Sequence, residues 1–285
     1  MSNFAIGNLM PETSLCTLEI EGPVARLTLT REDVYNALNI QLISEIISIL
    51  EWIKERSVGE RGTLNDEDGA PYLRVIVMSG AGKHFCAGAD INMMRDAGAK
   101  SPEENRADSE RLDRLFNSLW SHPCFTIGKI QGVALGGGAG LIACLDHVIV
   151  DSGTRIALSE GKLGILPAVI GPYVYRKVGS AEFRRLSMLA GRIGAEEALR
   201  IGLVSQLAPS LDGAEDTVVA EVLTTGPMAV TEAKKLTLTF DRWTGTDEEL
   251  RTWTLDKTSA MRGSGEGQEG LASFLEKRSP NWNEE

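Results

Sequence analysis

Hydrophobic and polar positions in the first half of the chain switch between the period of a strand and that of a helix. Apolar and polar residues alternate over residues 14–30 around a Gly-Pro turn, which predicts a β-hairpin. Over residues 37–55 the apolar side chains recur every three to four positions, which predicts an amphipathic helix. The polar segment 56–71 follows as a predicted surface excursion, and residues 72–80 then form a short apolar strand. Residues 102–119 are a long polar region with a helical pattern.

The middle of the chain repeats the order of strand and then helix. Residues 124–138 are predicted to be one strand that runs into glycines, and residues 139–146 a buried helix. Further strands are predicted at 147–152 and 154–160, and further helices at 181–189 and from Ala195 onward. After Pro209 the pattern is mostly helical. We therefore predict an α/β core over residues 1–208 and a helical region over residues 209–285.

The composition is that of a globular protein with an excess of acidic residues. The 285 residues can bury a full core, and 42% of them are hydrophobic. There are 29 Lys and Arg residues against 40 Asp and Glu residues, which gives a formal net charge of −11. This charge argues against nucleic acid as the main partner, because phosphate binding needs a basic surface. An anionic small molecule stays compatible with it, because a local cluster of cations can bind one.

The sequence contains no membrane-spanning, export or metal-binding pattern. No apolar run approaches the ~18 residues that cross a bilayer, and the first residues, MSNFAIGNLMPETSL, lack the basic and apolar regions of a secretory signal. The cysteines and histidines are far apart and form no CxxC or HxxxH pair, so we expect free thiols, no metal site and a cytoplasmic protein. These residues are Cys16, Cys86, Cys124, Cys144, His84, His122 and His147.

Two patches of small residues each lie between a predicted strand and a predicted helix. They are Ala87-Gly88-Ala89 and the LGGGAGL run at residues 135–141. Backbone N–H groups in the first turn of a helix have no internal partner, and small side chains leave them open to a ligand. One such site can bind phosphate, and two that converge can stabilise a carbonyl oxygen as it gains negative charge. The alternative is that the glycines only permit tight strand–helix packing, and neither patch matches GxGxxG or GxxxxGK[ST].

One acidic residue, Glu160, stands inside an otherwise apolar stretch rich in glycine and proline, ALSEGKLGILPAVIGPYV. Burial of a carboxyl group raises its pKa, and this suits proton transfer near neutral pH. Glu160 is therefore a candidate acid–base residue. The alternative is a surface charge or a helix cap.

Four segments, in this order, resemble the enoyl-CoA hydratase/isomerase (crotonase) family. They are KHFCAGADINMM, IQGVALGGGAGLIACLDHVIV, ALSEGKLGILPAVIGPYV and AEEALRIGLVSQL, and the similarity extends over residues 24–282. The resemblance implies a spiral of ββα units followed by C-terminal helices that assemble trimers, which often pair as hexamers. It also implies a coenzyme A thioester as substrate, with no prosthetic group.

The resemblance also assigns roles to individual residues. The backbone N–H groups of Ala89 and Gly137 would stabilise a thioester enolate, Ala87 would face the CoA adenine, and Asp90 would open the following helix. Two further residues, Phe274 and Lys277, would lie near the CoA of a neighbouring subunit. Lys277 would supply positive charge for the anionic cofactor portion.

The chain departs from the family pattern at Gly140. Hydratases of the best-known type carry one glutamate at this position and another at the position of Glu160. The similarity to bacterial hydratases of the methylglutaconyl-CoA or carboxygeranyl-CoA kind favours water addition to an enoyl-CoA, with Glu160 as the single acid. Lys129 and Gly140 are then candidate acyl-chain contacts, with Lys129 meeting an acyl carboxylate unless it is only a solvated residue at a strand end. An enoyl-CoA isomerase, an acyl-CoA decarboxylase and a non-catalytic CoA-binding protein are the alternatives.

Overall fold

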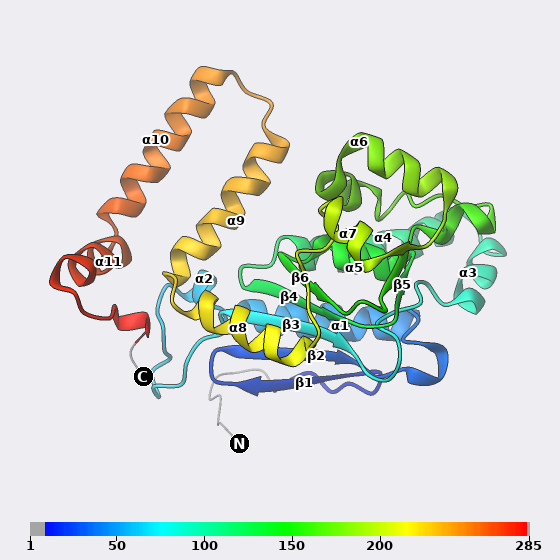
Figure 1. Cartoon of the computed structure of the whole chain (residues 1–285), viewed down its shortest axis with the longest axis horizontal. Helices are drawn as coiled ribbons and strands as arrows, with labels where there is room; N and C mark the ends of the chain where they lie inside the picture. Colours follow the sequence, from blue (N-terminus) through cyan, green and yellow to red (C-terminus); the bar gives the residue numbers. More distant parts are fainter. Residues whose placement is uncertain (1–8, 284–285) are drawn as a thin grey trace.

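The larger of two β-sheets forms the centre of the fold. The computed structural model describes residues 9–283. Its six-stranded sheet has the order β1-β2-β3-β4-β6-β9 (Figure 1). The first two strands form the predicted antiparallel hairpin, and all later pairings in this sheet are parallel. The strands are β1 (Cys16–Glu21), β2 (Val24–Leu29), β3 (Val75–Gly80), β4 (Phe125–Ile130), β6 (His147–Val150) and β9 (Gln206–Leu207).

A second sheet of three short strands stands beside the first, in the order β5-β7-β8. These strands are β5 (Val133–Leu135), β7 (Arg155–Ala157) and β8 (Ile193–Gly194). The prediction of one strand over residues 124–138 is therefore wrong, because β4 and β5 belong to different sheets. The chain turns between them at Gly132, whose φ of +66° favours glycine and where a Cβ atom would collide with the Lys83 carbonyl oxygen.

Helices cover both faces of the larger sheet. The predicted helix after the hairpin is α1 (Ile40–Glu55). Asn39 caps its N-terminus, where the Asn39 side chain accepts a hydrogen bond from the Leu42 N–H. Its apolar face packs into the main core together with α4 (Pro102–Trp120) and α5 (Gly137–Cys144). On the opposite face, α8 (Leu211–Leu223) packs against alternate residues of β3 and β4. Both faces are thus buried, as expected of a mostly parallel sheet.

Two helices differ from the predicted ranges. The segment 56–71 contains a short helix, α2 (Val58–Arg61), and the helix predicted at 181–189 is the second part of α6 (Gly171–Leu189). The backbone of α6 breaks at Gly179, where φ is +74°. The remaining helices of the core are α3 (Ile91–Gly98) and α7 (Ala195–Arg200), with short 3-10 helices η1 (Glu32–Val34) and η2 (Ser159–Leu163).

The last part of the chain is helical, as predicted, and much of it projects from the core. Figure 1 shows α9 (Pro227–Arg242) and α10 (Asp247–Gly263) side by side, running in opposite directions and extending away from the sheets. The chain then returns through α11 (Gly265–Glu276) and the 3-10 helix η3 (Asn281–Asn283). We call the pair α9 and α10 the projecting hairpin.

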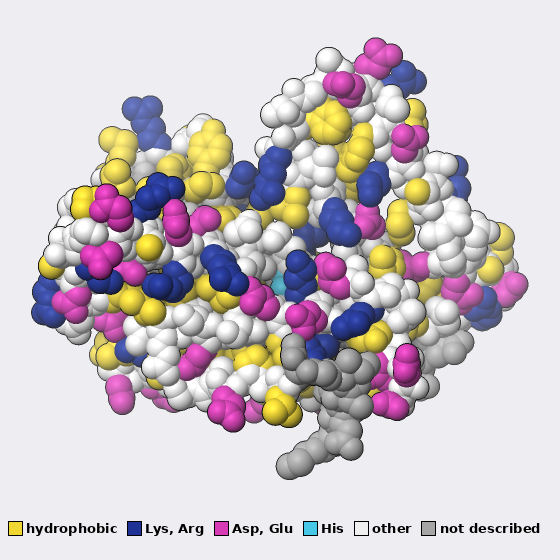
Figure 2. Space-filling view, turned by 180° about the vertical axis from the view of Figure 1, so that it is seen from behind, with side chains coloured by type: hydrophobic (Ala, Val, Ile, Leu, Met, Phe, Trp, Pro, Cys, Tyr) yellow, Lys and Arg dark blue, Asp and Glu magenta, His cyan; other side chains and the backbone are white. Residues whose placement is uncertain are grey.

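The surface carries charges of both signs. Figure 2 shows Lys and Arg side chains interspersed with Asp and Glu side chains, and apolar side chains exposed on the projecting hairpin at the right of that view. Across residues 9–283, none of the helices combines the length and apolar character that a membrane crossing requires. The four cysteines are free and buried, which confirms the prediction of free thiols.

Candidate active site

The first small-residue patch is fixed between two neighbouring segments by backbone hydrogen bonds. The Leu38 N–H donates to the Gly88 carbonyl oxygen at 2.7 Å, and the Asp90 N–H donates to the Leu38 carbonyl oxygen at 2.9 Å. On the other side, Cys86 forms a bridge to β5, where its carbonyl oxygen accepts from the Leu135 N–H at 3.0 Å. Because β5 leads directly into α5, these bridges bring the first patch to the start of that helix.

The two patches converge closely enough to exclude side chains between them. A Cβ atom added to Gly88, whose φ is +99°, would lie 2.6 Å from the Leu135 carbonyl oxygen and 3.5 Å from the Gly137 nitrogen. A Cβ atom added to Gly137 would lie 3.7 Å from the Ala89 nitrogen. Within residues 9–283, the N–H groups of Ala89 and Gly137 have no hydrogen-bond acceptor. The structure therefore brings two free backbone donors side by side, and an oxyanion hole requires such a pair.

Asp90 caps the helix that follows the first patch. Its carboxylate accepts hydrogen bonds from the backbone N–H groups of Asn92 and Met93, at 3.0 and 3.5 Å. The same carboxylate forms an ion pair with Arg31 at 3.2 Å. These contacts give Asp90 the position at the start of α3 that the resemblance implied, and they fix the direction of the chain after Ala89.

Glu160 lies in η2, beside the second patch. A Cβ atom added to Gly136 would lie 3.1 Å from its Oε1 atom, so the carboxyl group stands against the residue that precedes Gly137. Its Oε2 atom is buried, with no hydrogen-bond partner in the described part of the chain. Burial raises the pKa of Glu160 above its ordinary value of 4.5. The carboxyl group can therefore take up and return a proton closer to neutral pH than an exposed glutamate.

Two cavities meet at these residues. The outer cavity has a volume of about 420 Å³ and extends past η1 and the first patch. The inner cavity has a volume of about 370 Å³ and extends between α3, α4 and the loop before α6. Ala89, Gly137 and Glu160 line both cavities. A substrate that fills both cavities would thus place its central bonds beside the two free N–H groups and the buried carboxyl group.

The wall of the inner cavity that α4 contributes was not predicted from the sequence. Asn105, Asp108, Ser109 and Leu112 of this helix line the cavity. Their separations of three and four positions place them on one helical face, which is the signal that could have been read from the sequence. That signal was weak because this part of α4 is polar on all sides.

Lys129 lies outside both cavities, so the structure does not support the possible contact with the acyl chain. Side chains alternate between the two faces of a strand, and Lys129 points with Ile127 toward α8. Its ammonium group forms ion pairs there with Asp212 at 2.7 Å and Glu215 at 2.9 Å. The cation thus tethers α8 to the sheet.

Gly140 is buried in α5 and lines neither cavity, so the structure does not support its possible contact with the acyl chain either. A Cβ atom at this position would overlap with Cγ2 of Ile170 and lie 3.0 Å from Cε1 of Phe116. The space in which a side chain at position 140 would extend is therefore filled by two apolar side chains.

Phe274 and Lys277 stand apart from the site within one chain. Both are exposed on or just after α11, and neither lines the outer or the inner cavity. Ala87, by contrast, lines the outer cavity. The implied contact of Phe274 and Lys277 with CoA thus requires a second subunit and stays a prediction.

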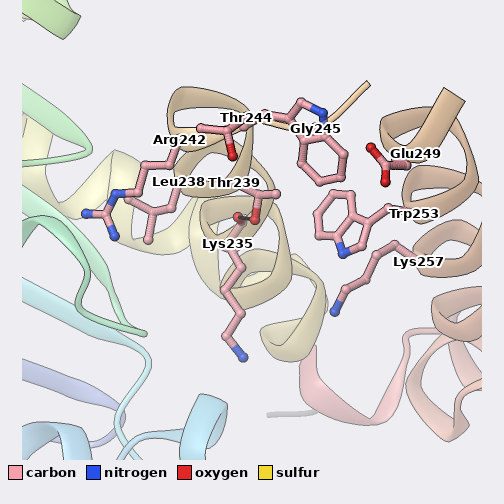
Figure 3. A pocket seen from close by; sticks show the side chains of 10 residues that line it. Lys235, Leu238, Thr239, Arg242, Thr244, Gly245, Glu249, Trp253 and Lys257 are labelled. Atoms are coloured by element: carbon pink, nitrogen blue, oxygen red, sulfur yellow. Dashed lines mark hydrogen bonds between the residues drawn. The ribbon is translucent and has the colours of Figure 1, made fainter. Parts of the chain in front are cut away.

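A larger hollow lies elsewhere, on the projecting hairpin. Its volume is about 750 Å³, and Trp243 is among the residues that line it. Figure 3 shows the indole ring of Trp253 together with Lys235, Arg242 and Lys257 along its walls. It contains neither small-residue patch nor Glu160, and it is an open surface between α9 and α10. The free backbone donors and the buried carboxyl group therefore point to the two smaller cavities. Among the described residues, no group of three or more His, Cys, Asp or Glu side chains is arranged to hold a metal ion.

Comparisons with known proteins agree with this arrangement. The family model described as enoyl-CoA hydratase/isomerase matches residues 19–285. A short-chain-enoyl-CoA hydratase of Clostridium acetobutylicum is 32% identical over 222 residues, which are 76% of this chain and 78% of that protein. A crotonyl-CoA hydratase of Syntrophomonas wolfei is 29% identical over 93% of this chain and 96% of its own length.

The fold is also similar to solved structures of enoyl-CoA hydratases. The crystal structure of an enoyl-CoA hydratase from Shewanella pealeana superposes with a TM-score of 0.86 at 35% identity, covering 95% of this chain and 97% of that one. The spiral of strands and helices is therefore the crotonase fold. With a family model that spans nearly the whole sequence, the chain belongs to the enoyl-CoA hydratase/isomerase family.

Proposed function

We propose that this protein adds water across the C2=C3 double bond of an enoyl-CoA thioester, with Glu160 as its single acid–base residue. One observation carries the proposal: where two cavities meet, a buried carboxyl oxygen and two backbone N–H groups lie side by side, and none of the three has a hydrogen-bond partner among residues 9–283. In this arrangement the CoA portion occupies the outer cavity and the acyl chain occupies the inner one.

The two N–H groups stabilise the charge that develops on the thioester oxygen. When water attacks C3, the electrons of the double bond move toward the carbonyl group and form an enolate. Ala89 and Gly137 donate hydrogen bonds to this oxygen. Loss of one such donor typically raises a barrier by about 2.7–4 kcal/mol.

Glu160 transfers the proton. As a carboxylate it accepts a proton from water while the water oxygen bonds to C3. As a carboxylic acid it then donates that proton to C2 of the enolate, so hydroxyl and hydrogen are added and the residue returns to its starting state. The raised pKa supports this cycle, because the acid form is then stable enough to exist between the two steps.

A second candidate reaction is isomerisation, in which the double bond of the acyl chain moves from C3=C4 to C2=C3. It is favoured by the packing at Gly140, where Ile170 and Phe116 leave no room for a second acid. An isomerase needs only one carboxyl group, which removes a proton from C2 of a 3-enoyl thioester and returns it to C4. The oxyanion hole has the same role in both reactions.

The assembly belongs to the same proposal, because the resemblance suggests a trimer or hexamer and a cytoplasmic location. The resemblance also suggests a methylglutaconyl-like acyl chain, and the experiment below compares that charged chain with the neutral crotonyl chain. No Lys or Arg lines the outer cavity among residues 9–283, whereas Asp33 and Asp90 do. This lining supplies no positive charge for the anionic CoA portion, and Lys277 of a neighbouring subunit would supply it.

The test is to incubate the protein with crotonyl-CoA, 3-methylglutaconyl-CoA and a 3-enoyl-CoA, and to follow the absorbance of the conjugated thioester. Hydration removes this absorbance from the first two compounds, isomerisation creates it from the third, and decarboxylation releases carbon dioxide.

Glu160→Gln should lower the rate about 10²–10⁴-fold. Glu110→Gln, which changes an exposed acid that lines neither cavity, is the matched control. Near-normal turnover by Glu160→Gln would overturn the proposal, and binding without turnover of any substrate would indicate a non-catalytic protein.

A further inference from the structure

The inner cavity is apolar along most of its wall. Met93 and Ala97 of α3, Leu112 of α4, and the loop that runs from Ile165 to Ile170 contribute apolar side chains. Its volume of about 370 Å³ corresponds to roughly a dozen water-sized atoms, at about 30 Å³ for each. If this cavity holds the acyl chain, as the proposed function requires, it accepts a chain of medium length.

The charges on this wall are all negative. Asp108 and Glu160 line the cavity, and no Lys or Arg lines it in the part of the chain that the structure describes. Asn105 and Ser109 add only neutral polar groups. A carboxylate at the end of an acyl chain would therefore meet like charges and no cation to pair with.

Asp108 is held in its charged form by two cations that stand outside the cavity lining. Its Oδ2 atom is 2.6 Å from Nζ of Lys100, and its Oδ1 atom is 3.0 Å from Nη1 of Arg111. The hydrogen bond from Lys100, with a further contribution from Arg111, lowers the pKa of Asp108. Asp108 thus stays ionised at neutral pH, and it also occupies the two cations that could otherwise bind an acyl carboxylate.

We propose that Asp108 is a specificity-determining residue that makes the inner cavity select neutral acyl chains and reject chains that end in a carboxylate. The inference rests on the proposed function, because it takes the inner cavity as the acyl site. Like charges in a partly buried cavity repel strongly enough to decide between two otherwise similar ligands. The methylglutaconyl-like chain suggested by the resemblance is therefore the wrong class of substrate for this cavity.

The test uses two saturated thioesters that cannot react by hydration or isomerisation. Glutaryl-CoA ends in a carboxylate, and 5-methylhexanoyl-CoA carries an isopropyl group of the same shape in its place. Isothermal titration calorimetry on the whole protein should give a dissociation constant at least about tenfold lower for the neutral ligand. If neither ligand binds, the proposed function fails. If both bind equally, the acyl-CoA site stands and the selection by Asp108 is refuted.

Two variants assign the effect to Asp108. Asp108→Asn removes the negative charge and frees Lys100 and Arg111, so glutaryl-CoA should bind at least about tenfold more tightly than to the wild type, while 5-methylhexanoyl-CoA changes less than about twofold. Lys100→Gln leaves Asp108 less compensated and should widen the preference for the neutral ligand, which gives a second test if the first variant does not fold. Glu110→Gln is the control, because Glu110 is exposed on the same helix and pairs with Arg106 at 3.0 Å, outside the cavity lining. An unchanged ratio in Asp108→Asn would overturn the inference.

Discussion

Glu160 combines two properties that are rarely found in one carboxyl group of a folded protein. It is half-buried, and its buried Oε2 atom has no hydrogen-bond partner in the described residues. Most buried polar atoms do have a partner, so an orphaned oxygen that faces a cavity indicates a group whose partner is a ligand. At the residue scale, the chemistry of this site therefore depends on the protonation of one side chain.

The pH dependence of turnover should reveal this group. Water addition begins with Glu160 as a carboxylate, so the rate should fall as the pH drops through the pKa of Glu160 in the folded protein. Burial raises that pKa above 4.5, and the fall should therefore be centred above pH 4.5. A profile of kcat/KM against pH between 4 and 8 measures it. A rate that stays constant down to pH 4.5 would show that another group carries the proton.

The raised pKa of Glu160 should also affect the stability of the protein, but in the opposite direction: turnover rises with pH, whereas the contribution of Glu160 to stability falls. The folded state binds the Glu160 proton more tightly than the unfolded state, so the contribution of this group to stability is fully present below about pH 4.5. It is lost as the pH rises through the higher folded pKa. Glu160→Gln should therefore unfold at a higher temperature than the wild type at pH 7, because the wild type has lost this contribution at that pH. The difference should disappear near pH 4.

Thermal unfolding followed by circular dichroism at several pH values measures this difference. Asp33→Asn, which removes an exposed acid, provides the comparison and should show no such trend. Equal unfolding temperatures for Glu160→Gln and the wild type at every pH would mean that the Glu160 carboxylate is hydrated in the folded protein.

The chemical properties of single residues could be predicted from the sequence better than the contacts that their side chains form. The apolar surroundings of Glu160 in the chain correctly indicated a raised pKa, because its neighbours in sequence are also its neighbours in space. The pairing of Lys129 with Asp212 and Glu215 was beyond reach, because these acids are more than 80 positions away. For the same reason, the presence of Asp108 and Glu160 in the lining of one cavity could not be predicted from the sequence.

At the scale of elements, the packing of α5 against its neighbours decides how many acids the site contains. Gly140 faces Ile170, which precedes α6, and Phe116 of α4. Gly140→Ala should lower the free energy of unfolding, because the added methyl group overlaps with Ile170. Overpacking of a core typically costs about 1–3 kcal/mol, and the better helix propensity of alanine returns up to about 1 kcal/mol.

A double-mutant cycle tests this contact. Ile170→Ala removes Cγ2, the atom that the new methyl group would overlap, so Gly140→Ala should cost less in that background than in the wild type. Urea unfolding measures the four free energies. Gly263→Ala in α10 is the matched control, because a Cβ atom there meets nothing within 4 Å, and it should be neutral or stabilising. Additive effects would show that α5 and Ile170 move apart freely.

Elements with one clear period were predicted well, and short elements were not. The hairpin of β1 and β2, the helix α1 and the helix α4 follow patterns that burial on one face imposes. The division of residues 124–138 into β4 and β5 depends on contacts of Gly132 with Lys83, which lies almost 50 residues away in the chain. Strands of two or three residues, such as β7 and β8, are set by their partners and leave little pattern of their own.

At the scale of the whole molecule, the C-terminal helices expose several large apolar side chains to solvent in the single chain. Exposed side chains of this kind gather on α9, α10 and α11 and mark a surface that another chain can cover. They are Phe240, Leu255, Leu271, Phe274 and Leu275. Light scattering after gel filtration should therefore give three or six times the mass of one chain, which is 30.8 kDa.

A sharper prediction concerns which chain completes the site. If Phe274 and Lys277 act on the CoA of a neighbouring subunit, a working site takes Glu160 from one chain and these two residues from the next. Glu160→Gln should be inactive through its missing acid. The double variant Phe274→Asp, Lys277→Glu should bind the thioester poorly, with a KM raised about tenfold or more, because an anion replaces a cation beside the CoA phosphates.

Mixing the two variants distinguishes sites within one chain from sites between chains. After mild dissociation and reassembly of the mixture, some interfaces join an intact Glu160 from the double variant to an intact Phe274 and Lys277 from Glu160→Gln. Activity at low substrate concentration should then rise severalfold above the average of the separate proteins. In sites built within one chain, every site would keep one of the two defects, and mixing would restore nothing. Mixing each variant with itself is the control, and the absence of recovery in a mixture shown to exchange subunits would place Phe274 and Lys277 outside the neighbouring site.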